Sequence, residues 1–215
     1  MTYLSGMRSF HQKDRLFKPL LTFMTMFDAL MIATECMKTG VLDKTSGHGV
    51  IEAHQFNLWV KFPVLVWTDF MTKNVTPRGF QLIFSSKPSS PSGPQIGPTM
   101  FGYKSTTMAI TMAIYVAFYE RYKEWIEQKF GRDKKAWPPF FNFTRTIRNF
   151  IVHHDGKVHF ENPKAAAVTW HHITYSPADM GKQAAGHGHI SVGDIIVLLV
   201  EFGDQLDNAG CPFPL

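Results

Sequence analysis

The strongest constraint on the fold is the helical periodicity of residues 106–130. Apolar side chains recur there at three- and four-residue steps, so they fall on one face of an α-helix. Charged residues gather in the last turns, and Gly131 follows as a helix end. The apolar face contains Met108, Met112, Tyr115, Val116, Tyr119, Tyr122, Trp125 and Ile126. The pattern predicts a long amphipathic helix.

Two apolar stretches upstream follow the same period. The first predicts a helix from Asp14 to about Lys38, with Pro19 in its first turns, where proline is tolerated. Gly40 is a natural stop. The second stretch, Ile51–Met71, contains Pro63, and we interpret it as a kinked helix or two short helices.

Two more helices are predicted in the C-terminal part. One covers Phe141–His154 and leaves through an Asp155-Gly156 turn. The last covers about Val192–Leu206, with Ser191 as its N-cap and Asp194 as the acidic partner of a capping box. The fold class expected from these elements is mainly α.

Other segments break the helical pattern. Residues 85–100 are rich in proline, serine and glycine and predict a loop, and Gly79–Phe84 reads as a short strand before it. Between about 158 and 175, β-branched and aromatic residues alternate, which predicts a small hairpin inserted before the last helix.

Length and composition favour one folded domain over residues 1–215. The chain has 45% apolar and 18% charged residues, which is enough apolar material for a core and unlike a disordered protein. No apolar run approaches the ~20 residues that a membrane helix needs. The N-terminus also lacks the pattern of a signal peptide. We expect a protein without membrane contact.

Charge and cysteine content restrict partners and compartment. The net charge of +5 permits RNA binding without requiring it. Cys36 and Cys211 are the only cysteines and have no metal-binding spacing, so neither a disulfide framework nor a zinc ribbon is expected. A reducing cytoplasm fits this content best.

The run Arg148-Asn149-Phe150-Ile151-Val152-His153 has the groups for metal-free RNA cleavage. An imidazole can take the proton of a 2′-hydroxyl, and a guanidinium can hold a phosphate through two hydrogen bonds. Asn149 would orient the imidazole or the phosphate. Near the negative end of the helix dipole, His153 and His154 are expected to have raised pKa values.

Helix geometry separates the two main groups. Arg145, Asn149 and His153 share a face, whereas Arg148 and His153 lie roughly 140° apart around the axis. One helix alone is therefore not expected to superpose them, although a long Arg side chain can reach across the groove. A second copy of the chain across a two-fold axis would bring both types together.

The Arg148–His153 run, followed by His154-Asp155-Gly156, resembles the Arg-polar-x(3–5)-His motif of the HEPN superfamily. The resemblance covers about residues 141–206, including Trp170, and is weaker upstream. It implies a helical bundle and a homodimeric, cofactor-free endoribonuclease that leaves a 2′,3′-cyclic phosphate. Both His153 and His154 fit the family spacing, and His153 is preferred because it shares a face with Asn149. The resemblance does not identify an antitoxin partner.

Basic residues beside this run could contact the RNA backbone. Arg132, Lys134 and Lys135 precede the helix, and Arg145 lies one turn before Arg148. Phosphate-tracking cations next to aromatic rings are typical of single-strand binding. A flanking loop whose aromatic residues turn inward is an equal interpretation.

Two alternatives stay open. In the first, the same residues form a structural polar cluster in a catalytically inactive HEPN-like interaction or nucleotide-binding protein. In the second, His171, His187 and His189 bind a metal, since imidazole suits zinc, nickel or copper. His171 and His172 would face opposite sides of a strand, so at most one of them could join such a site.

Overall fold

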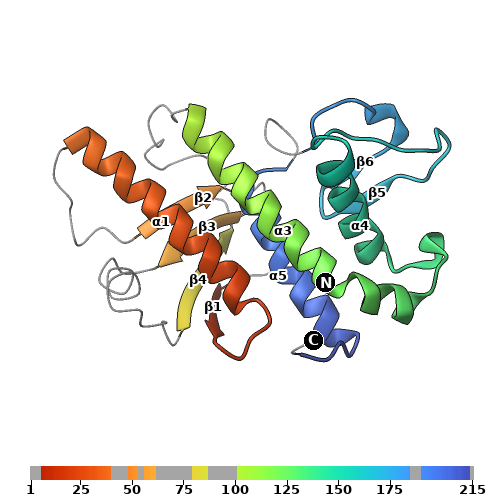
Figure 1. The fold of residues 1–215 in the computed structure, drawn as a ribbon, viewed down its shortest axis with the longest axis horizontal. Helices are drawn as coiled ribbons and strands as arrows, with labels where there is room; N and C mark the ends of the chain where they lie inside the picture. Colours follow the sequence, from red (N-terminus) through yellow and green to blue (C-terminus); the bar gives the residue numbers. More distant parts are fainter. Residues whose placement is uncertain are drawn as a thin grey trace. The chain divides into compact units, whose positions relative to one another are not determined.

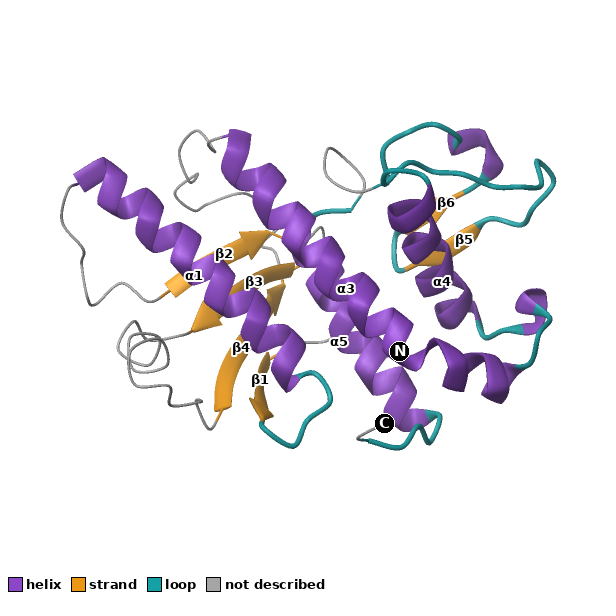
Figure 2. Cartoon of the chain, viewed as in Figure 1, coloured by secondary structure: helices purple, strands orange, loops and turns teal. Residues whose placement is uncertain are grey.

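The computed structural model describes residues 6–39, 48–52, 56–61, 79–86, 101–184 and 190–213. These residues are mainly helical, as the sequence predicts (Figure 2). The chain divides into two compact units, Met1–Thr107 and Met108–Leu215. Each unit is described by itself.

The N-terminal unit contains a sheet and a helix (Figure 1). The strand order is β1-β4-β3-β2, and every neighbouring pair is antiparallel. β1 was not expected from the sequence, whereas the strand predicted at Gly79–Phe84 is confirmed within β4. The elements are β1 (Gly6–His11), α1 (Phe17–Thr39), β2 (His48–Glu52), β3 (Phe56–Lys61) and β4 (Gly79–Ser86).

The helix expected within Ile51–Met71 is wrong where the structure describes this stretch. Residues 48–52 and 56–61 are strands, and Ile51 pairs with Leu58 in the antiparallel register. β-Branched and aromatic residues are dense here and favour a pleated strand over a helix. Residues 62–78, including Pro63, lie outside the described residues, as does the predicted loop from residue 87 onward.

α1 confirms the first predicted helix. The Asp14 carbonyl accepts a hydrogen bond from the Phe17 N–H, and Pro19 is the third helical residue. The Asp14 carboxylate accepts from the His11 N–H, so it stabilises the turn before the helix. Side chains of α1 that are buried in the structure include Phe17, Leu20, Leu21, Phe23, Met24 and Phe27.

The long predicted helix is confirmed as α3 (Phe101–Phe130), which starts five residues earlier than expected. It ends at Gly131, whose φ of 82° belongs to the left-handed region that glycine adopts readily. A short 3-10 helix, η1 (Lys134–Ala136), follows, capped by the Asp133 side chain.

α4 (Pro139–His153) and α5 (Val192–Asn208) confirm the two C-terminal helices. Ser191 caps α5 as predicted: its hydroxyl accepts from the Asp194 N–H, and the Asp194 carboxylate accepts from the Ser191 N–H. Every residue of α5 from Gly193 to Val200 is buried. α5 is therefore the central helix of the C-terminal unit.

The predicted hairpin is present but shorter than expected. β5 (Val168–Trp170) and β6 (Ile173–Tyr175) pair antiparallel beside α4 (Figure 2), and η2 (Pro177–Asp179) follows. Residues 158–167 are not in strands. His171 and His172 form the turn of the hairpin, so the expectation that they alternate along a strand is wrong. His171 has a φ of 50°, which non-glycine residues rarely adopt.

The core of the C-terminal unit fixes α4 against α3. The buried Tyr115 hydroxyl of α3 donates to the Thr144 carbonyl of α4 at 2.8 Å. On its other side, α4 packs Phe143 against Trp170 and Tyr175 of the hairpin.

No helix among the described residues is long and apolar enough to cross a membrane.

The pH dependence of stability tests a buried acid in α1. Burial raises the pKa of Asp28 from 3.8 to about 7, and its Oδ2 has no hydrogen-bond partner among the described residues. The folded state thus keeps the proton that the unfolded chain loses. This contribution to the free energy of unfolding is fully present below about pH 4 and falls as pH rises toward 7, by at most about 1.4 kcal/mol per pH unit.

Urea unfolding of the wild type and Asp28→Asn at pH 5 and pH 7 measures this term. The variant should lose less stability between the two pH values than the wild type. Glu124→Gln, at an exposed carboxylate of α3, is the control and should follow the wild type. Equal pH dependence in Asp28→Asn and wild type would contradict the assignment.

Candidate functional site

The C-terminal end of α4 sets the position of the motif residues. The Phe150 carbonyl accepts hydrogen bonds from the N–H groups of His154 and Gly156, at 3.2 and 2.8 Å. Asp155 and Gly156 have φ values of 53° and 73°, so the chain turns out of the helix there, as predicted. His153 is the last helical residue, and His154 is the C-cap.

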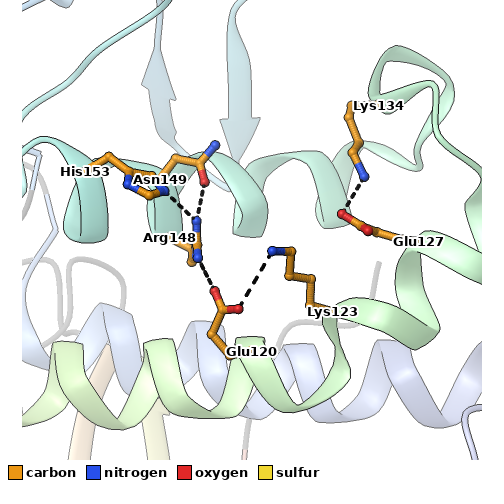
Figure 3. Close-up of polar contacts among 7 residues, drawn as sticks. All are labelled: Glu120, Lys123, Glu127, Lys134, Arg148, Asn149 and His153. Atoms are coloured by element: carbon orange, nitrogen blue, oxygen red, sulfur yellow. Dashed lines mark hydrogen bonds and ion pairs between the residues drawn. The ribbon is translucent and has the colours of Figure 1, made fainter.

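Arg148, Asn149 and His153 meet at one place on α4 (Figure 3). Arg148 Nη1 donates to Asn149 Oδ1 at 3.0 Å and lies 2.9 Å from His153 Nε2. The angular separation of about 140° does not keep Arg148 and His153 apart, because the long Arg side chain reaches across the groove, as the sequence allows. The Arg148 side chain does not project radially but bends along the helix surface to reach the His153 ring.

The contact with Arg148 is compatible with one tautomer of the His153 ring. A guanidinium can only donate hydrogen bonds, so the Nε2 atom of His153 must accept with its lone pair. The ring is then neutral and carries its proton on Nδ1. His153 is solvent-exposed, so its ring can be reached from outside. In this tautomer the Nε2 lone pair could act as a general base once the contact with Arg148 is released.

Glu120 of α3 belongs to this site, although it could not be predicted from the sequence. Arg148 Nε and Nη2 both donate to its Oε1 atom (Figure 3). Lys123 Nζ lies 3.9 Å from the other carboxylate oxygen. Glu120 is one of the charged residues that gather in the last turns of the predicted helix, and its separation of 28 positions from Arg148 gives no local signal of contact.

The guanidinium of Arg148 is largely enclosed. Its side chain is 14% exposed, against 38% for Glu120. Burial raises the pKa of Tyr119 well above its usual range, and the nearby guanidiniums of Arg145 and Arg148 partly oppose that rise. Both arginines of α4 therefore act on the part of α3 that holds Tyr119 and Glu120.

The His154 ring does not share the neighbour of His153. The ring of His154 stacks on His159 with centroids 3.9 Å apart and planes inclined by 21°. The pKa of His154 is lowered, first by burial and then by the charges of His159 and His153. This direction is opposite to the raised pKa expected for His154, because desolvation and the neighbouring imidazoles disfavour its charged form.

The predicted RNA-contacting residues lie at two positions. Lys134 pairs with Glu127 at 2.7 Å and sits 4.2 Å from the centroid of the Trp137 ring. The hydrogen bond from Lys134 lowers the pKa of Glu127. Arg132 and Lys135 are exposed beside them, whereas Trp137 is buried.

Arg145 is held on α4 itself. Its Nη2 donates to Asn142 Oδ1 at 3.2 Å, and its Nε is buried without a hydrogen-bond partner among the described residues. The neighbouring Phe141 and Phe143 are buried, so these two rings turn inward, as in the second interpretation of this segment.

The structure gives His171 a partner other than a metal. Its Nε2 lies 2.8 Å from Glu201 Oε1, and the second oxygen of Glu201 accepts from the Trp170 indole at 2.7 Å. His187 and His189 lie outside the described residues. Within the described part of the chain, no group of three or more His, Cys, Asp or Glu residues could hold a metal ion.

Comparison of the chain with known protein families, curated proteins and solved structures gives no match. The resemblance to the HEPN superfamily therefore stays a prediction from the motif residues. The function has to be argued from the chemistry of the site.

The stacked imidazoles give a titration test. Replacing His159 with alanine removes a positive neighbour and part of the enclosure, so the pKa of His154 should rise. Glu161→Gln should have the opposite effect, because the Glu161 charge raises that pKa. NMR titration of the His154 ring measures both shifts. Movement in the same direction in both variants would refute this account.

Proposed function

We propose that the C-terminal unit binds and cleaves single-stranded RNA without a metal ion, as a HEPN-type ribonuclease. The observation that carries the proposal is the 2.9 Å contact between Arg148 Nη1 and His153 Nε2. A phosphate-binding cation and a neutral imidazole are thereby within reach of a single phosphodiester. Asn149 holds the same guanidinium nitrogen and keeps the two groups in register.

Arg148 and His153 have separate roles in the proposed reaction. Arg148 binds non-bridging oxygens of the phosphate and stabilises the charge that builds on them. His153 Nε2 takes the proton of the 2′-hydroxyl, and the resulting oxygen attacks phosphorus. The bond to the 5′-oxygen breaks, and that oxygen takes up a proton from solvent. The products are a 2′,3′-cyclic phosphate and a free 5′-hydroxyl.

Backbone phosphates away from the cleavage point would meet the basic turn after α3. Arg132 and Lys135 are exposed there, and Lys134 is held by Glu127. Exposed cations add sequence-independent, salt-sensitive affinity. In this proposal Arg145 supports the phosphate site through its field and not by direct contact, since its Nε is buried.

The ion pair between Glu120 and Arg148 favours a second candidate. It joins α3 to α4, as a structural polar cluster would. In that case the protein is an inactive HEPN-like interaction or nucleotide-binding protein, and the Arg148–His153 contact serves only the end of α4. Loss of stability without any cleavage is the signature of this function.

A homodimer is a separate part of the proposal. HEPN-type sites are composite, but here a single chain already brings Arg148 to His153. The proposed reaction therefore does not need a second copy to complete this pair. Light scattering of the purified protein, with cleavage measured across a range of protein concentrations, tests whether a dimer contributes to activity.

An RNA cleavage assay with excess EDTA tests the proposed function. Wild-type protein should cut labelled single-stranded RNA in the presence of the chelator, and the product should end in a 2′,3′-cyclic phosphate. Arg148→Ala and His153→Ala should each lower the rate by about 100-fold or more, because each removes one of the two reacting contacts.

Two further variants serve as controls in this assay. Arg121→Ala removes an exposed arginine of α3 and should leave the rate unchanged. His154→Ala tests the adjacent imidazole and should have a smaller effect than His153→Ala, because His154 stacks on His159. Full activity in His153→Ala with loss in His154→Ala would reverse the assignment of the base. Absence of cleavage by folded wild type would favour the second candidate.

A further inference from the structure

The hydrogen bonds of Arg148 divide its guanidinium into two edges. A guanidinium has five N–H donors, and the Nε and Nη2 groups form one edge of it. This edge is bound to the carboxylate of Glu120. Nη1, on the opposite side, donates to Asn149 and to His153. One N–H of Nη2, next to Nη1, is left for a ligand.

This arrangement limits how a phosphate can bind. Two parallel hydrogen bonds to phosphate oxygens need two neighbouring donors. The edge of Nη1 and Nη2 supplies them only if Nη1 releases one of its present acceptors. His153 is exposed at the last position of α4, whereas Asn149 lies one turn inside the helix. His153 is therefore the acceptor that a phosphate displaces.

Glu120 lies on a part of α3 that is fixed by buried contacts. The neighbouring Tyr119 is buried at 2% exposure, and Tyr115, one turn earlier, is bonded to the Thr144 carbonyl of α4. Lys123 lies close to the second carboxylate oxygen. The anchor of Arg148 thus comes from a helix that is fixed relative to α4 within the same unit.

We propose that Glu120 is a positioning residue for the ribonuclease reaction: it holds Arg148 by the Nε–Nη2 edge so that the Nη1–Nη2 edge faces the scissile phosphate. Phosphate binding then takes Nη1 away from His153. The freed Nε2 lone pair faces the bound nucleotide and becomes the base for its 2′-hydroxyl. This inference rests on the proposed function, and it assigns to Glu120 a role that neither the motif nor its spacing contains.

The charge of Glu120 makes the effect on binding and on rate separable. Its carboxylate partly cancels the attraction of Arg148 for phosphate, so removing it does not weaken binding. Removing it does release the guanidinium from a fixed orientation, and misplacement of a reacting group lowers the rate. A positioning role thus predicts a loss in kcat with KM unchanged or lower.

The test compares Glu120→Ala, Glu120→Gln and the control Glu124→Ala in single-stranded RNA cleavage. Glu120→Ala should lower kcat by about 10- to 100-fold without raising KM. Glu120→Gln keeps an acceptor oxygen and should recover most of kcat. Glu124→Ala, at an exposed carboxylate one turn further along α3, should match wild type. Thermal unfolding of each variant shows that it is folded.

An NMR readout separates this inference from the proposed function. The Arg148 Nε–H signal should be protected in wild type and Glu120→Gln and lost in Glu120→Ala. Adding a 2′-deoxy dinucleotide, which cannot be cleaved, should leave that signal in place while shifting the ring signals of His153. Loss of the Nε–H signal on binding, or failure of the dinucleotide to bind, would overturn the inference.

The kinetic outcomes are equally distinct. A higher kcat/KM in Glu120→Ala through faster turnover would show that Glu120 competes with phosphate, and it would overturn the positioning role. An unchanged kcat would do the same while leaving the proposed function intact. Wild type that cleaves no RNA would defeat the proposed function, and the dinucleotide titration would still decide how Glu120 and phosphate share Arg148.

Discussion

Phe202, in the middle of α5, contacts aromatic rings from both α3 and α4. Its centroid lies 5.6 and 5.7 Å from those of Phe118 and Tyr119, and 6.3 and 6.0 Å from those of Phe140 and Phe141. Burial of such rings is the main source of stability in a core of this kind. The separation between α3 and α4, which the polar site requires, follows from this packing.

The polar contacts between α3 and α4 orient the Arg148 side chain more than they stabilise the fold. Glu120 is 38% exposed, and an ion pair with that access to water contributes at most about 1 kcal/mol. Arg148 is more enclosed and has acceptors on both edges of its guanidinium. The enclosure selects one orientation of this side chain, and the direction of its donors is what a phosphate would meet.

Much of the helical part of the fold could be predicted, because a 3.6-residue period is visible in a single chain. α1, α3, α4 and α5 and the Ser191–Asp194 capping box follow from local patterns. The strands at His48–Glu52 and Phe56–Lys61 did not, since short apolar runs fit either structure and the pairing that stabilises a strand is non-local. The prediction of His171 in a strand failed for a related reason. The turn that contains His171 is held by Glu201 of α5, which lies 30 positions further along the chain.

Prediction of the site failed where side-chain length and tertiary contact matter. The motif residues could be named from sequence, and the length of the Arg148 side chain allowed its contact with His153, but angles around the helix axis did not predict that contact. The end of the helix also separates the two adjacent histidines. His153 keeps helical geometry and reaches Arg148, whereas His154, with a φ of −134°, leaves the helical path and stacks on His159. The choice of base therefore depends on where α4 ends, so a change that extended the helix past Asp155 and Gly156 would alter the neighbours of His154 more than those of His153.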